Sequence, residues 1–89
     1  MILDDAGKAA AAASLGLALR SHRQAAGLTL QHVADAAQLS KSYLSDCERG
    51  RRLPSLPALV EIADALGTDA QRLLQATWPF SESGRRPPS

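Results

Sequence analysis

The chain has 89 residues and a net charge of +1, which is enough for one small domain and too little for a catalytic domain beside a regulatory one. Alanine (17 residues) and leucine (14 residues) dominate, whereas Trp, Tyr and Phe occur once each, so we expect an all-α fold rather than a sandwich or barrel. The single cysteine, Cys47, excludes an internal disulfide and any multi-cysteine zinc site. No apolar run approaches the ~20 residues of a membrane span, so we expect a cytoplasmic protein without membrane contact.

Positive charge is concentrated in residues 14–53, where six basic side chains face three acidic ones. Such an excess weakly indicates a polyanionic partner. An ordinary solvated face explains the same charges equally well, so charge alone does not decide between the two interpretations.

Composition divides the chain into three parts. Residues 1–13 form an Ala-rich N-terminal extension, which either lengthens the first helix or frays. Residues 14–78 carry the periodic apolar pattern of a folded domain. Residues 79–89 contain three Ser and three Pro and are expected to form a flexible tail.

Five helices are predicted in chain order within residues 14–78. The first spans about residues 15–26, the second ends near residue 37, and the third, fourth and fifth come after it with short breaks. The expected N-caps of the last four are Thr29, Ser40, Ser55 and Asp69, and the expected stops are Gly27, Gly50 and Gly67. In the fourth helix, the residues expected to face the core are Leu56, Leu59, Val60, Ala63 and Leu66.

The second and third helices are separated by only about three residues. Short helices joined so tightly cross at a steep angle, as in a helix-turn-helix, and the apolar Leu39 in the turn is expected to enter the core. The third helix has a polar outer face that can enter a major groove. The residues of this polar face are Lys41, Ser42, Ser45, Asp46 and Arg49. Arg49 and the loop residues Arg51 and Arg52 are placed to meet phosphates.

Two runs carry a family resemblance: residues 28–34 (LTLQHVA) and residues 39–50 (LSKSYLSDCERG). Residues 14–76 resemble the Cro/lambda-repressor-like (XRE-type) helix-turn-helix family. The resemblance rests on these two runs together with residues 19–29, 54–56 and 63–67. The resemblance implies five helices, with a helix-turn-helix formed by the second and third. It also implies a transcriptional regulator that binds double-stranded DNA in the cytoplasm, on the nucleoid. We also expect a homodimer that binds a palindromic operator and contacts RNA polymerase or another regulatory protein.

No catalytic arrangement and no Gly-rich phosphate loop is visible in the sequence, so we expect neither an enzyme nor a cofactor. The Ala- and Arg-rich composition with only two lysines indicates a bacterial or phage source.

The resemblance also implies roles for individual residues. The expected base contacts are Lys41, Ser42, Ser45 and Asp46, and Thr29, Gln31 and Tyr43 join the arginines as expected phosphate contacts. Glu48 is expected to pair with Arg23 of the first helix. Asp46 either accepts a hydrogen bond from a cytosine amine or only solvates the helix.

Dimer contacts are expected around the fifth helix, at Leu73, Leu74, Trp78 and Phe80. Exposed aromatic side chains favour interfaces, although Trp78 and Phe80 would also serve to cover the core.

Three residues depart from the family pattern. Leu30 stands where many members have a glutamine that contacts DNA, and Gln38 stands where a turn glycine is common. Gln38 is therefore expected to carry modest strain if its φ is positive. Cys47 replaces an aliphatic residue and is expected to be a small core side chain without a redox or metal role.

Two alternative functions stay open on the sequence. One is a DNA-binding antitoxin whose tail wraps a toxin, although the tail here is short and Pro-rich. The other is a protein-interaction module that has kept the fold without binding DNA. The basic residues Lys41, Arg49, Arg51 and Arg52 argue against that second alternative.

Overall fold

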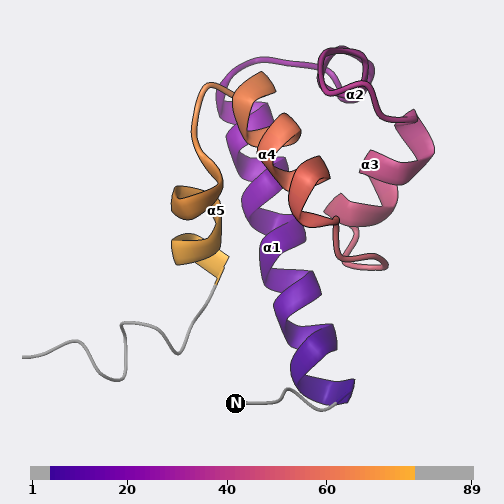
Figure 1. Cartoon of the computed structure of the whole chain (residues 1–89), viewed down its shortest axis with the longest axis vertical. Coiled ribbons are helices and arrows are strands. Elements are labelled where there is room, and N and C mark those ends of the chain that lie inside the picture. The colour runs from indigo at the N-terminus through magenta and orange to yellow at the C-terminus, as the bar shows by residue number, and fades with distance from the viewer. Residues whose placement is uncertain (1–4, 78–89) are drawn as a thin grey trace, which may run out of the picture.

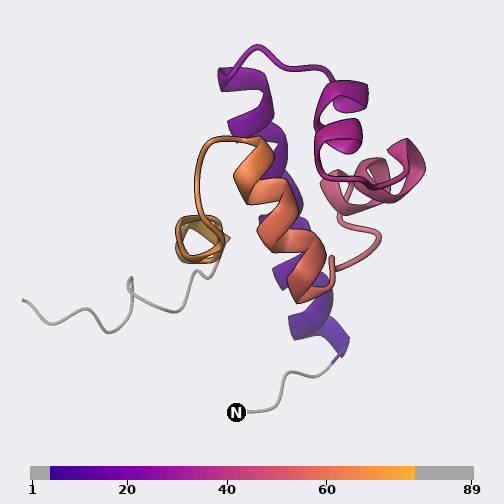
Figure 2. The same ribbon diagram turned by 45° about the horizontal axis from the view of Figure 1, so that its top comes forward.

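The computed structural model describes residues 5–77, which form five helices. Their bounds are α1 Asp5–Ala25, α2 Leu30–Ala36, α3 Lys41–Glu48, α4 Leu56–Ala65 and α5 Ala70–Thr77. The long α1 runs through the whole domain and packs against α3 and α5 (Figure 1). The pair α2–α3 lies on one side of α1 and α4, and α5 lies on the other side (Figure 2). The five-helix fold predicted from the sequence is therefore confirmed.

The predicted helix boundaries result from local capping. The side-chain oxygens of Thr29, Ser40 and Ser55 accept hydrogen bonds from backbone N–H groups three residues later, at 3.0, 3.0 and 3.2 Å. Asp69 caps α5 in the same way through the N–H of Arg72, at 2.8 Å. Each cap satisfies a backbone donor that the first turn of a helix leaves unpaired. The stops Gly27, Gly50 and Gly67 all adopt positive φ, which glycine reaches without steric cost.

The helix-turn-helix closes through Gln38, which adopts a φ of 59°. This left-handed conformation is strained for a residue with a Cβ, as expected where glycine is common. The next residue, Leu39, compensates for the strain, because its N–H bonds the Ala34 carbonyl at 2.9 Å and its side chain packs against the core.

The first helix begins ten residues earlier than its apolar pattern predicts. The alanine run before Leu15 continues α1 without a break back to Asp5, so this stretch lengthens the helix. Alanine has the highest helix propensity, and Ala12 is buried against the rest of the domain.

The core is aliphatic, as the composition predicts. Its fully buried large side chains come from all five helices and are Leu19, Val33, Leu44, Cys47, Ile62 and Leu73. Cys47 is thus a core side chain, in agreement with the sequence analysis.

Two sequence predictions about side-chain direction need correction. Leu56 and Val60 point to solvent with 66% and 49% exposure, whereas Ile62 is fully buried. The buried stripe of α4 is rotated from the predicted one and consists of Ala58, Leu59, Ile62 and Ala63.

Leu73, expected at a dimer contact, has no exposed surface because it fills the core of a single chain. Its neighbour Leu74 is 43% exposed, and Trp78 and Phe80 lie outside the described residues.

The helices α1 and α3 touch backbone to backbone at Gly16. A Cβ atom at this position would lie 2.5 Å from the Cys47 carbonyl oxygen and 2.6 Å from that of Glu48. Just beyond α3, a Cβ at Gly50 would lie 2.9 Å from Cα of Ala13. The end of α3 therefore rests directly on α1, and its position depends on glycine at these two contacts.

Replacing Gly16 with alanine should destabilise the domain. An added methyl group must push α3 away from α1, and such overpacking costs about 1–3 kcal/mol. Thermal unfolding followed by circular dichroism should show a melting temperature lower by several degrees. In an unobstructed helix the same change stabilises by up to ~1 kcal/mol, so an increase in melting temperature would contradict the close contact.

Candidate nucleic-acid interface

The outer surface of α3 forms an open hollow of about 420 Å³. Its lining residues, which define the α3 hollow, are Leu30, Lys41, Ser42, Ser45, Asp46 and Arg49. All four residues expected to contact bases lie in this one concavity, together with Arg49. Leu30 is the lining residue that comes from α2.

The direction of this face results from how α3 is held. Leu44 and Cys47 are buried on the opposite side, with 0% and 1% exposure, so the polar side chains turn outward. The Ser40 cap sets the first turn, in which Lys41 is exposed. A groove-reading helix needs this arrangement, with side chains near its N-terminus free to reach base edges.

Two of the expected phosphate contacts take part in the first turn of α2. The hydroxyl oxygen of Thr29 accepts the His32 N–H, which leaves the hydroxyl proton available to a further acceptor. The amide Nε2 of Gln31 donates to Oδ1 of Asp35 at 2.8 Å, and this hydrogen bond orients the exposed amide. Both side chains are thus held on the surface near the beginning of α2.

Tyr43 of α3 contacts both the loop that follows this helix and the start of α4. Its hydroxyl oxygen accepts the backbone N–H of Ser55 at 3.0 Å. The guanidinium carbon of Arg52 lies 5.1 Å from the centroid of the tyrosine ring, within cation–π distance. Arg51 is fixed through its backbone N–H, which bonds the carbonyl of Asp46 at 2.9 Å. The basic loop predicted from the sequence is therefore anchored to α3 at both arginines.

The predicted ion pair between Arg23 and Glu48 is present. Nε and Nη2 of Arg23 donate to the two carboxylate oxygens at 2.7 and 3.0 Å, in a bidentate geometry. Nη1 donates to the carbonyl of Leu28 at 3.0 Å, so the same guanidinium also fixes the α1–α2 connection. The side chains are 15% and 8% exposed. The hydrogen bond to Glu48 raises the pKa of Arg23, so the guanidinium stays protonated.

A second, smaller hollow of about 190 Å³ adjoins the first. Its lining residues, which define the arginine hollow, are Arg20, Arg23, Leu30, Ser45, Glu48 and Arg49. Arg23 is neutralised by Glu48, whereas the guanidinium groups of Arg20 and Arg49 have no partner within residues 5–77. Because three lining residues are shared, the α3 hollow continues into a cationic surface that reaches α1.

Sequence reasoning missed Arg20. The available signal was its spacing, since it precedes Arg23 by one helical turn and so lies on the same side of α1. Recognising its contribution also requires knowing that α1 passes the end of α3, which is a tertiary fact.

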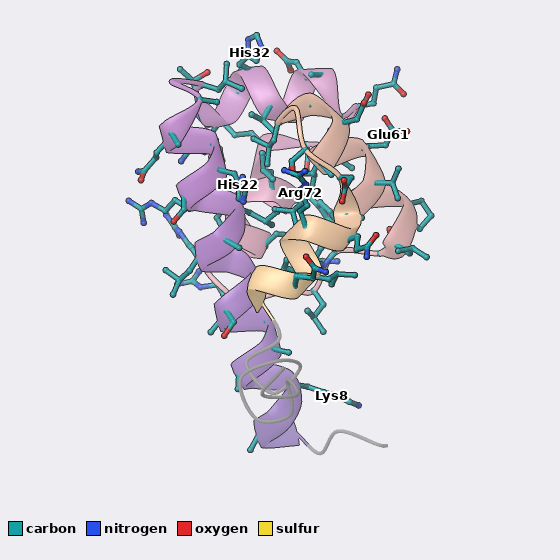
Figure 3. All side chains as sticks on the ribbon, turned by 90° about the vertical axis from the view of Figure 1, so that its left-hand side faces the viewer. Lys8, His22, His32, Glu61 and Arg72 are labelled. Atoms are coloured by element: carbon teal, nitrogen blue, oxygen red, sulfur yellow. The ribbon has the colours of Figure 1, made fainter. Side chains whose placement is uncertain are left out.

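The described part of the chain holds neither a reactive cysteine nor a metal site nor a membrane-spanning helix. Burial raises the pKa of the Cys47 thiol to about 11, so the thiol remains protonated at neutral pH. His22 and His32 lie on separate elements and far apart in Figure 3. Among residues 5–77, no three His, Cys, Asp or Glu side chains come together as a metal site. None of the helices in this range is long and apolar enough to cross a membrane.

Comparisons with known proteins converge on one family. A family model described as a helix-turn-helix domain matches residues 14–76. The HTH-type transcriptional regulator DdrOP3 of Deinococcus deserti is 49% identical over 57 residues, which are 64% of this chain and 44% of that protein. The chain spans about half the length of the curated relatives it matches.

Two solved structures are similar to this fold. The clp gene regulator ClgR from Corynebacterium glutamicum superposes with a TM-score of 0.73 and 39% identity, over 75% of this chain and 71% of that chain. The restriction-modification controller protein C.AhdI from Aeromonas hydrophila gives a TM-score of 0.68 and 34% identity, over 70% and 94% of the two chains.

Replacing Glu48 with alanine should unfold much of the protein. The change strands the Arg23 charge in a largely buried position, which costs about 3–5 kcal/mol, and a small domain has only about 5 kcal/mol in total. We expect Glu48→Ala to have lost most of its helical circular dichroism at 37 °C.

The double variant Arg23→Met, Glu48→Leu is the matched control, because it removes both charges and restores apolar packing. It should recover much of the stability that Glu48→Ala loses. If Glu48→Ala melted within a few degrees of the wild type, the ion pair would not hold the fold.

Proposed function

Since this chain belongs to the Cro/lambda-repressor-like (XRE-type) helix-turn-helix family, we propose that it is a DNA-binding transcriptional regulator that inserts α3 into the major groove. The observation that carries the proposal is the α3 hollow, which gathers donors and acceptors on the exposed side of an anchored helix. It acts without catalysis, in the cytoplasm and on the nucleoid.

Base reading is proposed for the N-terminal part of α3. Lys41 donates to O6 and N7 of a guanine, two acceptors that no other base offers together. Ser42 and Ser45 are short and allow close approach of the helix to base edges. Asp46 lines the same hollow and accepts a hydrogen bond from the N4 amino group of a cytosine.

Phosphate binding is proposed for the residues that surround this face. They are Thr29, Gln31, Tyr43, Arg49, Arg51 and Arg52, to which we add Arg20. Support comes from the stacking of Arg52 on Tyr43, which lowers the conformational entropy that phosphate binding costs. The unpaired guanidinium groups of Arg20 and Arg49 favour a backbone phosphate over the arginine hollow.

A homodimer on a palindromic operator is proposed because one recognition helix reads too few base pairs for a unique site. A two-fold axis would set two α3 helices in successive major grooves ~34 Å apart. Of the expected dimer contacts that the structure describes, Leu74 on α5 is the exposed one. Because α5 lies away from α3, an interface at α5 leaves the α3 hollow of each copy free. A groove of about 350 Å³ on α1, which contains the exposed Leu17 and also His22, offers further apolar surface. Figure 3 shows His22 on the face that α5 crosses.

The proposal is tested first by a gel shift with random DNA at low and moderate salt, followed by selection of bound sites from a random pool. Binding that weakens with salt and a symmetric selected site are expected. Absence of binding at low salt would contradict the proposal.

Replacing Arg51 and Arg52 with alanine should weaken binding to every DNA sequence by a similar factor. The slope of log affinity against log salt concentration should fall by about 0.9 for each phosphate that the variant no longer neutralises. Arg20→Ala should lower the slope by about the same amount, for one phosphate. Arg72→Ala is the control, because it removes one exposed positive charge from α5, and an equal change there would show only a net-charge effect.

Replacing Lys41 with alanine should affect specificity more than general affinity. We expect a loss of about 1–3 kcal/mol on the selected site and relaxed preference at one symmetric pair of positions. Binding to random DNA should lose only the contribution of one charge. Equal weakening on both DNAs would assign Lys41 to a phosphate instead.

Replacing Leu74 with glutamate should shift the protein toward monomers in analytical ultracentrifugation, because a charge would be buried at the interface. Leu56→Glu is the matched control, since Leu56 is an exposed leucine on α4. Monomers for the wild type, both free and on its selected site, would contradict the dimer.

A further inference from the structure

Leu30 is an apolar side chain in an otherwise polar hollow. The other residues of the α3 hollow are Lys41, Ser42, Ser45, Asp46 and Arg49, all from α3 or its C-cap. Leu30 belongs instead to the first turn of α2, and it also lines the arginine hollow. It therefore stands where the two hollows meet.

The position of Leu30 is fixed from two directions. Thr29 caps α2 immediately before it, which sets the backbone at the start of the helix. Part of the leucine side chain packs against the buried core, so the side chain is partly covered and cannot turn freely. The remaining part lines both hollows as an apolar wall facing the space in which a bound ligand would lie.

An aliphatic wall is a poor partner for a phosphate or for a base heteroatom, because it would desolvate these groups without a hydrogen bond. The edges of the bases in the major groove present one apolar group, the C5-methyl of thymine. The Lys41 ammonium and the Asp46 carboxylate in the same hollow serve the polar edges of neighbouring bases.

We propose that Leu30 reads thymine through contact with its C5-methyl group, so that α2 contributes to sequence specificity together with α3. The inference rests on the proposed insertion of α3 into the major groove. Burial of a single methyl group between Leu30 and the base supplies a modest preference for thymine at one symmetric pair of positions in the operator.

The experiment uses the full chain and the site selected from random DNA. Each thymine of that site is replaced in turn by uracil, which keeps every hydrogen-bonding group and removes only the methyl. For the wild type, uracil at one symmetric pair of positions should weaken binding about three- to fivefold per half-site, the effect of one buried methyl group. The other thymines should show no such effect.

The same DNA series is then measured with two variants. Leu30→Ala should bind thymine- and uracil-containing sites equally, because the wall that holds the methyl is gone. Leu28→Ala is the matched control, since Leu28 also packs against the core but lines neither hollow, and it should retain the wild-type sensitivity to uracil. Leu30→Gln, with a side chain of similar length, replaces Leu30→Ala if circular dichroism shows that the smaller residue prevents folding.

Two results would overturn the inference while leaving the proposed function intact. One is a selected site whose affinity is insensitive to uracil at every thymine. The other is a uracil effect that Leu30→Ala or Leu30→Gln retains in full. Failure of the wild type to select any site would instead contradict the proposed function itself.

Discussion

The geometry of this domain depends on how the end of α3 is held against α1. The bidentate Arg23–Glu48 ion pair fixes the rotation of α3 about its own axis. The backbone contact at Gly16 sets the distance between α3 and α1. A guanidinium needs both carboxylate oxygens in one plane to bond them together, so the pair tolerates little rotation of α3 about its axis. The glycine contact allows little lateral shift, because nothing but hydrogen separates the two backbones. Rotation and position are the two quantities that determine which residues of α3 face outward.

That constraint links the core to the surface. Leu44 and Cys47 enter the core from one side of α3, and Glu48 reaches Arg23 from the same end of the helix. The polar residues are left on the opposite side by geometry, and within residues 5–77 no side-chain hydrogen bond or ion pair holds them there. The loop after α3 is secured separately, through the Tyr43 hydroxyl and the Ser55 amide. A polar surface on a rigid support is the arrangement that binding with little reorganisation requires.

Local signals in the sequence predict most of the fold. The caps Ser40 and Ser55 and the stops Gly27 and Gly50 mark helix ends because they act through their own backbone neighbours. The start of α1 escapes such prediction because an alanine run has no polar side and hence no periodicity to read. The buried face of α4 is assigned wrongly because Val60 and Ile62 are both apolar, and only packing decides between them. For the same reason, two adjacent leucines on α5 cannot be ranked by residue type alone. The α3 hollow is predicted residue by residue except for Leu30, whereas Arg20 joins the surface only through the crossing of α1 and α3.

The outward side chains of α3 have little to do with the stability of the domain. Within residues 5–77, Lys41, Ser42 and Ser45 form no side-chain hydrogen bond or ion pair with the rest of the fold. Substitutions at these three positions are therefore expected to leave the stability of the domain almost unchanged. Under the proposed function, single mutations at these positions change the target sequence while the scaffold stays unchanged.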